Sequence, residues 1–291
     1  MDCLVSVVVP GEQVYGVAAV TTELVEQARA LHGASPTAAA ALGRLLTGGV
    51  LLSTQLKDPS HRLLLQVSGR GPVRKVVAEA DGAGRVRGYL GQPVVQVPSR
   101  NGKLDVAAAV GKGILHVIKD VGLPQPASGT VPLVSGEIAE DLAAYLLQSE
   151  QIPSAVALGV FVSPDYTVTA AGGFLVQTLA SVPESLLEHL ERTLAAVPPV
   201  TAMVREGNTP YEMLQQALAG LPLQVVRQAT PQWHCRCSRE RVVAALVALG
   251  ARELRQLIAE EEVTHVRCEF CTTAYTFTRE ELEALLREAL T

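Results

Sequence analysis

Short apolar runs separated by Gly- and Pro-containing turns dominate the first 180 residues of the chain. Runs of this length that are rich in Val, Leu and Ile are typical of β-strands. They predict strands at residues 4–9, 14–20, 61–68, 73–80, 85–90, 114–119, 131–133, 155–162 and 167–177. Apolar positions at helical spacing predict helices at residues 22–31, 35–57 and 137–149. The second of these is apolar on nearly every face, so we expect it to be buried inside a mixed α/β domain that ends near residue 179.

The pattern changes after residue 180. Leucines and valines recur at helical spacing between residues 181 and 221, but prolines interrupt them at positions 198, 199, 210 and 222. Short helices between prolines are marginally stable in isolation, because nucleating a helix is costly. We therefore expect these helices to depend on whatever surface they pack against. In the last 60 residues we expect helices at 239–249, 252–260 and 280–290 and a strand-like segment at 274–277.

These elements predict an α+β protein in three parts. Residues 1–179 form a mixed α/β domain, residues 180–229 a metastable helical linker, and residues 230–291 a small C-terminal domain. About sixty residues with so few aromatic side chains make a poor hydrophobic core, so we expect the C-terminal domain to need a bound metal for folding.

Four cysteines in that last part carry the most specific chemistry. Cys235 and Cys237 form a C-x-C pair, and Cys268 and Cys271 form a C-x-x-C pair about thirty residues later. Zinc is bound tetrahedrally by four thiolates at about 2.3 Å, and each pair can supply one edge of the tetrahedron. Thiols as close as those of C-x-C can also form a strained disulfide, which is easily reduced again. The cluster therefore suggests a site for one zinc per chain that can also act as a redox site.

Several interpretations of the four thiols stay open on spacing alone. A purely structural zinc ribbon, a nucleic-acid-binding zinc protein and a thiol-disulfide oxidoreductase all use such motifs. Against the oxidoreductase, the C-x-x-C does not open a helix after a strand of a βαβ unit. His234 and His265 flank the pairs and could replace a thiolate, but four cysteines already complete a tetrahedron. We expect both histidines to be bystanders.

Composition narrows the possible partners. The chain has 291 residues, 48% of them hydrophobic, and a net charge of −5 with acids and bases interspersed. A protein that binds the phosphate backbone of nucleic acids needs a basic face, so we expect no nucleic-acid partner. No run approaches the ~18 apolar residues of a membrane span, and the N-terminus lacks the basic segment of a signal peptide. Five cysteines, four of them clustered, favour a reducing cytoplasm, with Cys3 as a buried and inert thiol.

Motifs of catalysis are not found. The chain has no Walker A sequence and no G-x-S-x-G elbow, and Gly111-Lys112-Gly113 lacks the glycine loop of a phosphate cradle. Glu137, Glu140 and Asp141 form a carboxylate cluster, but their place at a helix start suits the helix dipole. We expect them to be structural, and we expect the protein not to be an enzyme.

Several segments resemble the redox-regulated holdase chaperone family, the thirty-three-kilodalton bacterial heat-shock proteins. The cysteine segments WHCRCS at 233–238 and VRCEFC at 266–271 are similar to the two motifs of that family. The stretch GEIAEDLAAYLLQSEQIPSA at 136–155 is similar to its long signature, and RVRGY at 85–89 and GKG at 111–113 match its glycine-containing segments. The resemblance extends in order over nearly the whole chain.

The resemblance implies a function that the residues alone do not show. It implies a substrate-binding and dimerising domain at 1–179, a metastable linker, and a zinc redox switch at 230–291. The implied activity is an ATP-independent holdase that binds unfolding clients under oxidative stress and is a homodimer when oxidised. The implied disulfides are Cys235–Cys237 and Cys268–Cys271, which form as zinc leaves.

Overall fold

The computed structural model describes residues 1–179 and 182–289. They fall into two compact units, Met1–His234 and the segment from Cys235 onward. The predicted division into three parts is not the same as these two units, because the residues of the predicted linker belong to the first unit. The start of that linker, residues 180 and 181, lies outside the described residues.

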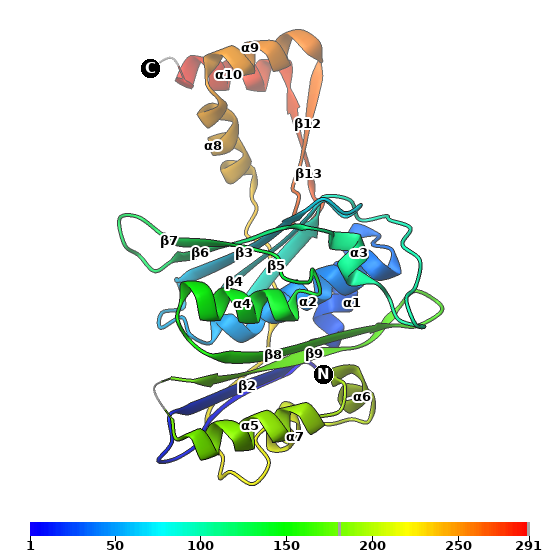
Figure 1. Ribbon diagram of the computed structural model, residues 1–291. Coiled ribbons are helices and arrows are strands. Elements are labelled where there is room, and N and C mark those ends of the chain that lie inside the picture. The colour runs from blue at the N-terminus through cyan, green and yellow to red at the C-terminus, as the bar shows by residue number, and fades with distance from the viewer. Residues whose placement is uncertain (180–181, 290–291) are drawn as a thin grey trace. The chain divides into compact units, whose positions relative to one another are not determined.

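Two sheets of mainly antiparallel strands build the first unit (Figure 1). The five-stranded sheet has the order β10-β1-β2-β9-β8, and its strands are β1 (Cys3–Val8), β2 (Val14–Val20), β8 (Ser154–Val162), β9 (Val168–Thr178) and β10 (Gln224–Ala229). The six-stranded sheet has the order β11-β5-β4-β3-β6-β7, with strands β3 (Arg62–Gly69), β4 (Lys75–Asp81), β5 (Arg85–Leu90), β6 (Gly113–Asp120), β7 (Ala127–Pro132) and β11 (Gln232–Trp233). Its one parallel pair joins β11 to β5.

Helix α2 (Pro36–Ser53) lies between the two sheets and contacts strands of both. All of its residues except Pro36 and Arg44 are buried, as its apolar composition predicts. Helices α1 (Thr22–His32), α3 (Val106–Val110) and α4 (Ala139–Ser149) complete this layer. Helix α1 ends at Gly33, whose φ of +58° is the left-handed conformation that favours glycine.

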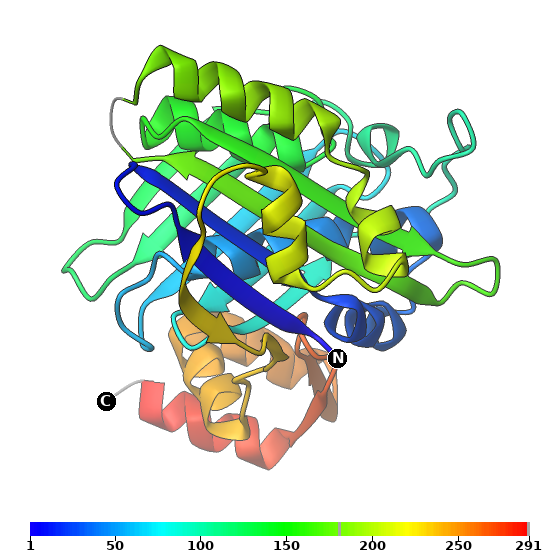
Figure 2. The ribbon, with the colours of Figure 1, turned by 90° about the horizontal axis from the view of Figure 1, so that it is seen from below.

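The linker helices cover the opposite face of the five-stranded sheet. They are α5 (Glu184–Ala196), α6 (Val200–Arg205) and α7 (Pro210–Ala217), and Figure 2 shows them lying across the strands. Their apolar stripes pack on the sheet in a second core, in which Leu190, Met203 and Leu214 meet Val7 and Phe174. We expected these short helices to depend on a supporting surface, and the five-stranded sheet of their own unit is that surface.

The second unit is a small layer of helices and one hairpin. It contains α8 (Arg239–Leu249), α9 (Ala251–Glu260), the antiparallel strands β12 (Val263–Arg267) and β13 (Ala274–Thr278), and α10 (Arg279–Ala289). Among its described side chains, the buried core consists of Leu246, Leu254, Phe277 and Leu282. Arg239 lies over the Phe277 ring at 4.3 Å and pairs with Glu281 at 2.7 Å, which closes one side of this core.

The α+β fold class is confirmed, and most predicted elements agree with the structure within a few residues. The helix expected at 35–57 ends at Ser53, where the Thr54 hydroxyl donates to the Leu51 carbonyl. The helix expected at 137–149 begins two residues later, at Ala139. Strands β10, β11 and β12 and helix α3 were not predicted. The predicted end of the last helix, at residue 290, lies outside the described residues.

Candidate metal centre

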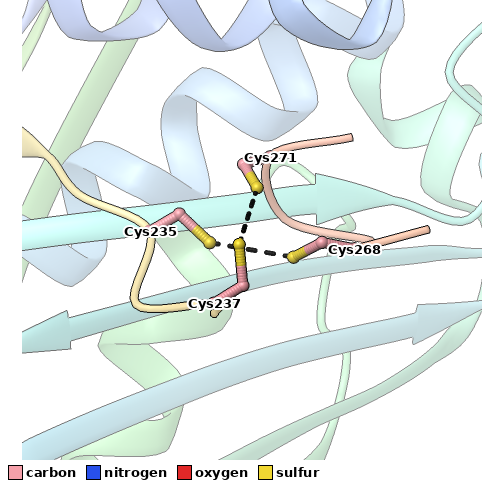
Figure 3. A group of neighbouring side chains, drawn as sticks. All are labelled: Cys235, Cys237, Cys268 and Cys271. Carbon is pink, nitrogen blue, oxygen red and sulfur yellow. Dashed lines mark hydrogen bonds between the residues drawn. The ribbon is translucent and has the colours of Figure 1, made fainter. Parts of the chain in front are cut away.

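The four predicted cysteines meet in one place (Figure 3). Their sulfur atoms all lie within 4.8 Å of one another. The Cys235 and Cys268 Sγ atoms are 3.7 Å apart, and the Cys237 and Cys271 Sγ atoms are 3.2 Å apart. None of the four forms a disulfide, and each is partly buried. Two segments more than thirty residues apart in sequence thus form one cluster of sulfur ligands.

Local backbone geometry positions each pair. The C-x-C pair precedes α8, which Ser238 caps by accepting a hydrogen bond from the Arg241 N–H at 3.3 Å. The C-x-x-C pair lies in the turn between β12 and β13, where Thr272 has a φ of +60°. Two backbone hydrogen bonds close this turn, from Cys268 N to Thr273 O at 2.9 Å and from Thr272 N to Cys268 O at 2.8 Å. This tight turn aims both thiols to the same side.

The surroundings of the thiols shift their pKa values in different directions. Burial raises the pKa of Cys268 to about 12, although backbone N–H groups of the turn oppose the shift. Burial also raises the pKa of Cys271, but hydrogen bonds with Thr273 and with the neighbouring thiols outweigh it and lower the value to about 6. The Tyr275 hydroxyl lies 3.1 Å from the Cys237 Sγ, and this hydrogen bond raises the tyrosine pKa to about 12. A cation bound between the four sulfurs would favour the thiolate form of each of them.

The donor set fits a soft, tetrahedral metal ion. A tetrahedron with metal–sulfur bonds of about 2.3 Å has sulfur–sulfur edges of roughly 3.8 Å. The Cys235–Cys268 distance of 3.7 Å matches that edge, and the Cys237–Cys271 distance of 3.2 Å is shorter than it. Four thiolates in this arrangement are typical of structural zinc sites. The four cysteines could therefore hold one metal ion.

The two flanking histidines lie outside the cluster. The His234 backbone N–H donates to the Val86 carbonyl at 2.9 Å within the first unit. The His265 Nδ1 is 3.4 Å from the Thr276 hydroxyl. Among the described residues, the group that could hold a metal comprises the four cysteines without either histidine. The fifth cysteine, Cys3, lies in β1 and is partly buried, and burial raises the pKa of its thiol.

Tyr275 and Thr273 are contacts of the cluster that the sequence did not indicate. The Cys271 Sγ and the Thr273 hydroxyl are 3.2 Å apart. Thr273 follows Cys271 by two residues, and Tyr275 follows it by four, within strand β13. Hydroxyl-bearing residues shortly after a thiol pair are the signal in the sequence that could have pointed to them.

The chain is similar to known proteins over nearly its whole length. Residues 2–278 match the family model described as Hsp33 protein. The chain belongs to the Hsp33 family. It is 47% identical over 291 residues to the 33 kDa chaperonin of Geobacter sulfurreducens, covering 100% of this chain and 96% of the relative. It is 44% identical to the 33 kDa chaperonin of Thermodesulfovibrio yellowstonii, covering 99% and 100%.

The fold of the family is also shared. The crystal structure of the 33 kDa chaperonin (heat shock protein 33 homolog) from Thermotoga maritima superposes with a TM-score of 0.90 at 37% sequence identity. The match covers 99% of this chain and 98% of that chain. The mixed α/β architecture is therefore that of the Hsp33 family.

Two carboxylates of the stretch 136–155, which resembles the family signature, form structural contacts. Asp141 is completely buried and accepts backbone hydrogen bonds from Val134, Ser135, Gly136 and Ile138 at 2.7–3.3 Å. These bonds fix a loop in which Ile138 has a φ of +74°, a strained value for a β-branched residue. Glu137 forms an ion pair with Arg44 of α2. Asp141 and Glu137 thus tie the start of α4 to its surroundings, whereas Glu140 is exposed.

Within residues 1–179 and 182–289, every helix falls short of the length and apolar character needed to cross a bilayer.

Proposed function

We propose that this protein is a redox-regulated, ATP-independent chaperone that holds unfolding proteins. The observation that carries the proposal is the cluster of four cysteine sulfurs within 4.8 Å, in a unit whose described residues include four buried core side chains. A cluster of this kind can fold such a unit when it is reduced and release it when it is oxidised. Membership of a family whose relatives are named 33 kDa chaperonin supports the chaperone activity.

In the proposed reduced state, Cys235, Cys237, Cys268 and Cys271 bind one zinc ion. When bound, the metal holds the four sulfurs as thiolates and fastens the C-x-C segment to the β12–β13 turn. Tyr275 and Thr273 orient the sulfurs of Cys237 and Cys271 through their hydroxyl groups. Structural zinc contributes on the order of 10–16 kcal/mol to small domains. The folded second unit is therefore expected to depend on these four ligands.

The proposed trigger is oxidation by a peroxide. A cysteine thiolate attacks one peroxide oxygen, the O–O bond breaks, and the products are a sulfenic acid and water once a proton is taken up. A second cysteine thiolate then attacks the sulfenic sulfur, a disulfide forms, and the departing hydroxide is protonated to water. Two disulfides consume two peroxide molecules. By resemblance to the family, the proposed pairs are Cys235–Cys237 and Cys268–Cys271.

A disulfide sulfur is a poor metal ligand, so the oxidised second unit is expected to unfold. The chain itself connects this event to the linker, because β11 and β10 directly precede Cys235 in sequence. Without a folded anchor after residue 234, these short strands would fray from their C-terminal end. The linker helices would then lose the paired strand that follows α7 in the chain, and as they loosen their apolar faces would become available to clients.

One experiment tests the proposal. Reduced protein is treated with hydrogen peroxide under mild heat, while zinc release and aggregation of a heat-unfolding test enzyme are followed together. We expect zinc release and suppression of aggregation to rise in parallel, without ATP, and to reverse on reduction. A Cys3→Ser variant should behave as the parent, whereas Cys268→Ser should hold clients without peroxide. Zinc release without any suppression of aggregation would contradict the proposal.

The proposed setting is the reducing cytoplasm, where the thiols stay free until an oxidant appears. Unfolded client proteins are the proposed partners, and the oxidised protein is proposed to be a homodimer. Sedimentation of reduced and oxidised protein would test the change in oligomeric state. A monomer in the active oxidised form would contradict that part of the proposal.

A further inference from the structure

Strand β10 forms one edge of the five-stranded sheet and covers β1 (Figure 2). The two strands pair antiparallel, from Leu4 opposite Ala229 to Val8 opposite Gln224. The register shifts between Ser6 and Val7, so that Val226 falls between two partnered residues. An irregularity of this kind interrupts the ladder of backbone hydrogen bonds.

The side chains of β10 add little to this pairing. None of its six residues, all of which the structure describes, is buried, and Val225 and Val226 are 40% and 53% exposed. Arg227 makes one further contact, donating a hydrogen bond to the Gly82 carbonyl at 2.8 Å. Strand β10 is therefore held on the sheet mainly by its backbone.

Strand β1 has the opposite character. Leu4, Val5, Ser6 and Val7 are all buried, with Leu4 in one core and Val5 and Val7 in the other. On its other side β1 pairs with β2 along its whole length. If β10 left, β1 would remain in the sheet with the unpaired N–H and C=O groups of a flat, apolar edge. Such an edge is a template for pairing with another extended chain.

The position of β10 in the chain makes it removable. It follows α7, it is flanked by Pro222 and Pro231, and Cys235 comes six residues after its end. A change in the second unit therefore reaches β10 before it reaches any of the linker helices.

We propose that β10 is a detachable cover strand, and that the edge of β1 binds an extended segment of an unfolded client by β-strand addition once β10 has left. This inference rests on the proposed chaperone function and specifies how the client is bound. Every unfolded protein carries the backbone groups that such an edge recognises, so the edge accepts clients of unrelated sequence. Proline-free, β-branched segments resembling VVRQA of β10 should bind best.

The first test uses the β10 sequence as the probe. A fluorescent peptide of residues 223–230 is added to the full-length protein, reduced or peroxide-activated, and its anisotropy is measured. We expect binding to the activated protein at least tenfold tighter than to the reduced protein. Two peptides, N-methylated at either Gln228 or Ala229, serve as a matched pair. Successive N–H groups of a strand point to opposite edges, so one methyl blocks pairing with β1 and the other faces away.

One methylated peptide should bind as the parent peptide does, and the other should lose at least tenfold in affinity. The same split should appear when the peptides compete with reduced, carboxymethylated α-lactalbumin, a permanently unfolded protein. Equal affinity of the two methylated peptides would overturn the inference, because recognition would then not depend on the backbone edge.

Hydrogen exchange supplies an independent measurement on the same protein. Among residues 4–8, the amides that face β10 should lose protection on activation and regain it when carboxymethylated α-lactalbumin binds, while the amides that face β2 should keep it. Those of β8, at the other edge of the sheet, should not change. If the amides of residues 4–8 that face β10 stayed protected in the activated protein without client, the inference would be overturned, since β10 or a second copy would then occupy the edge. If activated protein fails to suppress aggregation, the chaperone proposal itself fails; if it suppresses aggregation without these signatures, only the β1 edge is excluded.

Discussion

Removing the metal from the reduced protein should unfold the second unit and leave the first intact. Within the described part of that unit, the buried core consists of Leu246, Leu254, Phe277 and Leu282. Complete burial of one such side chain contributes roughly 1.5–3 kcal/mol. A structural zinc contributes on the order of 10–16 kcal/mol, which is at least comparable to this entire core. Because the net stability of a domain is only about 5–15 kcal/mol, the unit should not stay folded without its metal.

Hydrogen exchange after chelation is the direct assay. Amides of α8, α9 and α10 should lose protection together, while those of β3, β4 and β9 keep it. The Cys3→Ser variant is the matched control, because it removes a cysteine from β1 and leaves the metal ligands untouched. Cys268→Ser should reproduce the effect of the chelator. Retained protection of α8–α10 in protein shown to be free of zinc would refute the reasoning.

Four further changes test other parts of the structure. Leu190, 4% exposed beneath the linker helices, should lose about 3 kcal/mol or more of docking free energy as Leu190→Ser; reduced protein should then bind clients, and a variant as inactive as the parent would contradict this. Asp141→Ala leaves four backbone donors without their acceptor and should lower the unfolding free energy of the first unit by about 3–5 kcal/mol in urea titrations. Tyr275→Phe removes the hydroxyl beside Cys237 and should weaken zinc 10- to 100-fold in chelator competition; unchanged affinity would deny the tyrosine a positioning role. Glu26 has a pKa lowered chiefly by its hydrogen bond from Arg29, so its contribution is present above the unfolded value near 4.5 and is lost as the pH falls; Glu26→Gln should flatten the stability profile between pH 5 and 3.

Local signals in the sequence were sufficient for most of the fold. The buried helix α2 was predicted from its apolar composition, and Gly33 and Pro36 mark the end of α1 and the start of α2. The grouping of the four cysteines was also predicted, because C-x-C and C-x-x-C each place two thiols close together. The signals for the helices and for each cysteine pair join residues close together in sequence, whereas the meeting of the two pairs spans more than thirty residues.

Non-local interactions explain what was missed. Strand β10 has no buried side chain, so its residues carry no alternating pattern, and its conformation depends on β1, more than two hundred residues earlier. Strand β11 has two residues and exists through its pairing with Arg85 and Val86. The contact of Tyr275 with Cys237 requires the β12–β13 hairpin to bring the two together. The conformation of such elements depends on residues that are distant in sequence, so a local sequence pattern does not reveal it.

Strand β10 and the linker helices are held on the sheet to different degrees, so the protein could respond to oxidation in stages. Helices α5–α7 bury Leu190, Met203 and Leu214 against the sheet, whereas β10 buries none of its six side chains. When the second unit unfolds, we therefore expect β10 to detach from the sheet before helices α5–α7 do. A brief oxidation could open the edge of β1 alone, and a longer one could expose the apolar face under the helices as well. Two surfaces of different character would then become available in sequence, first one that recognises backbone and then one that recognises apolar side chains, which suits a chaperone that meets clients at successive stages of unfolding.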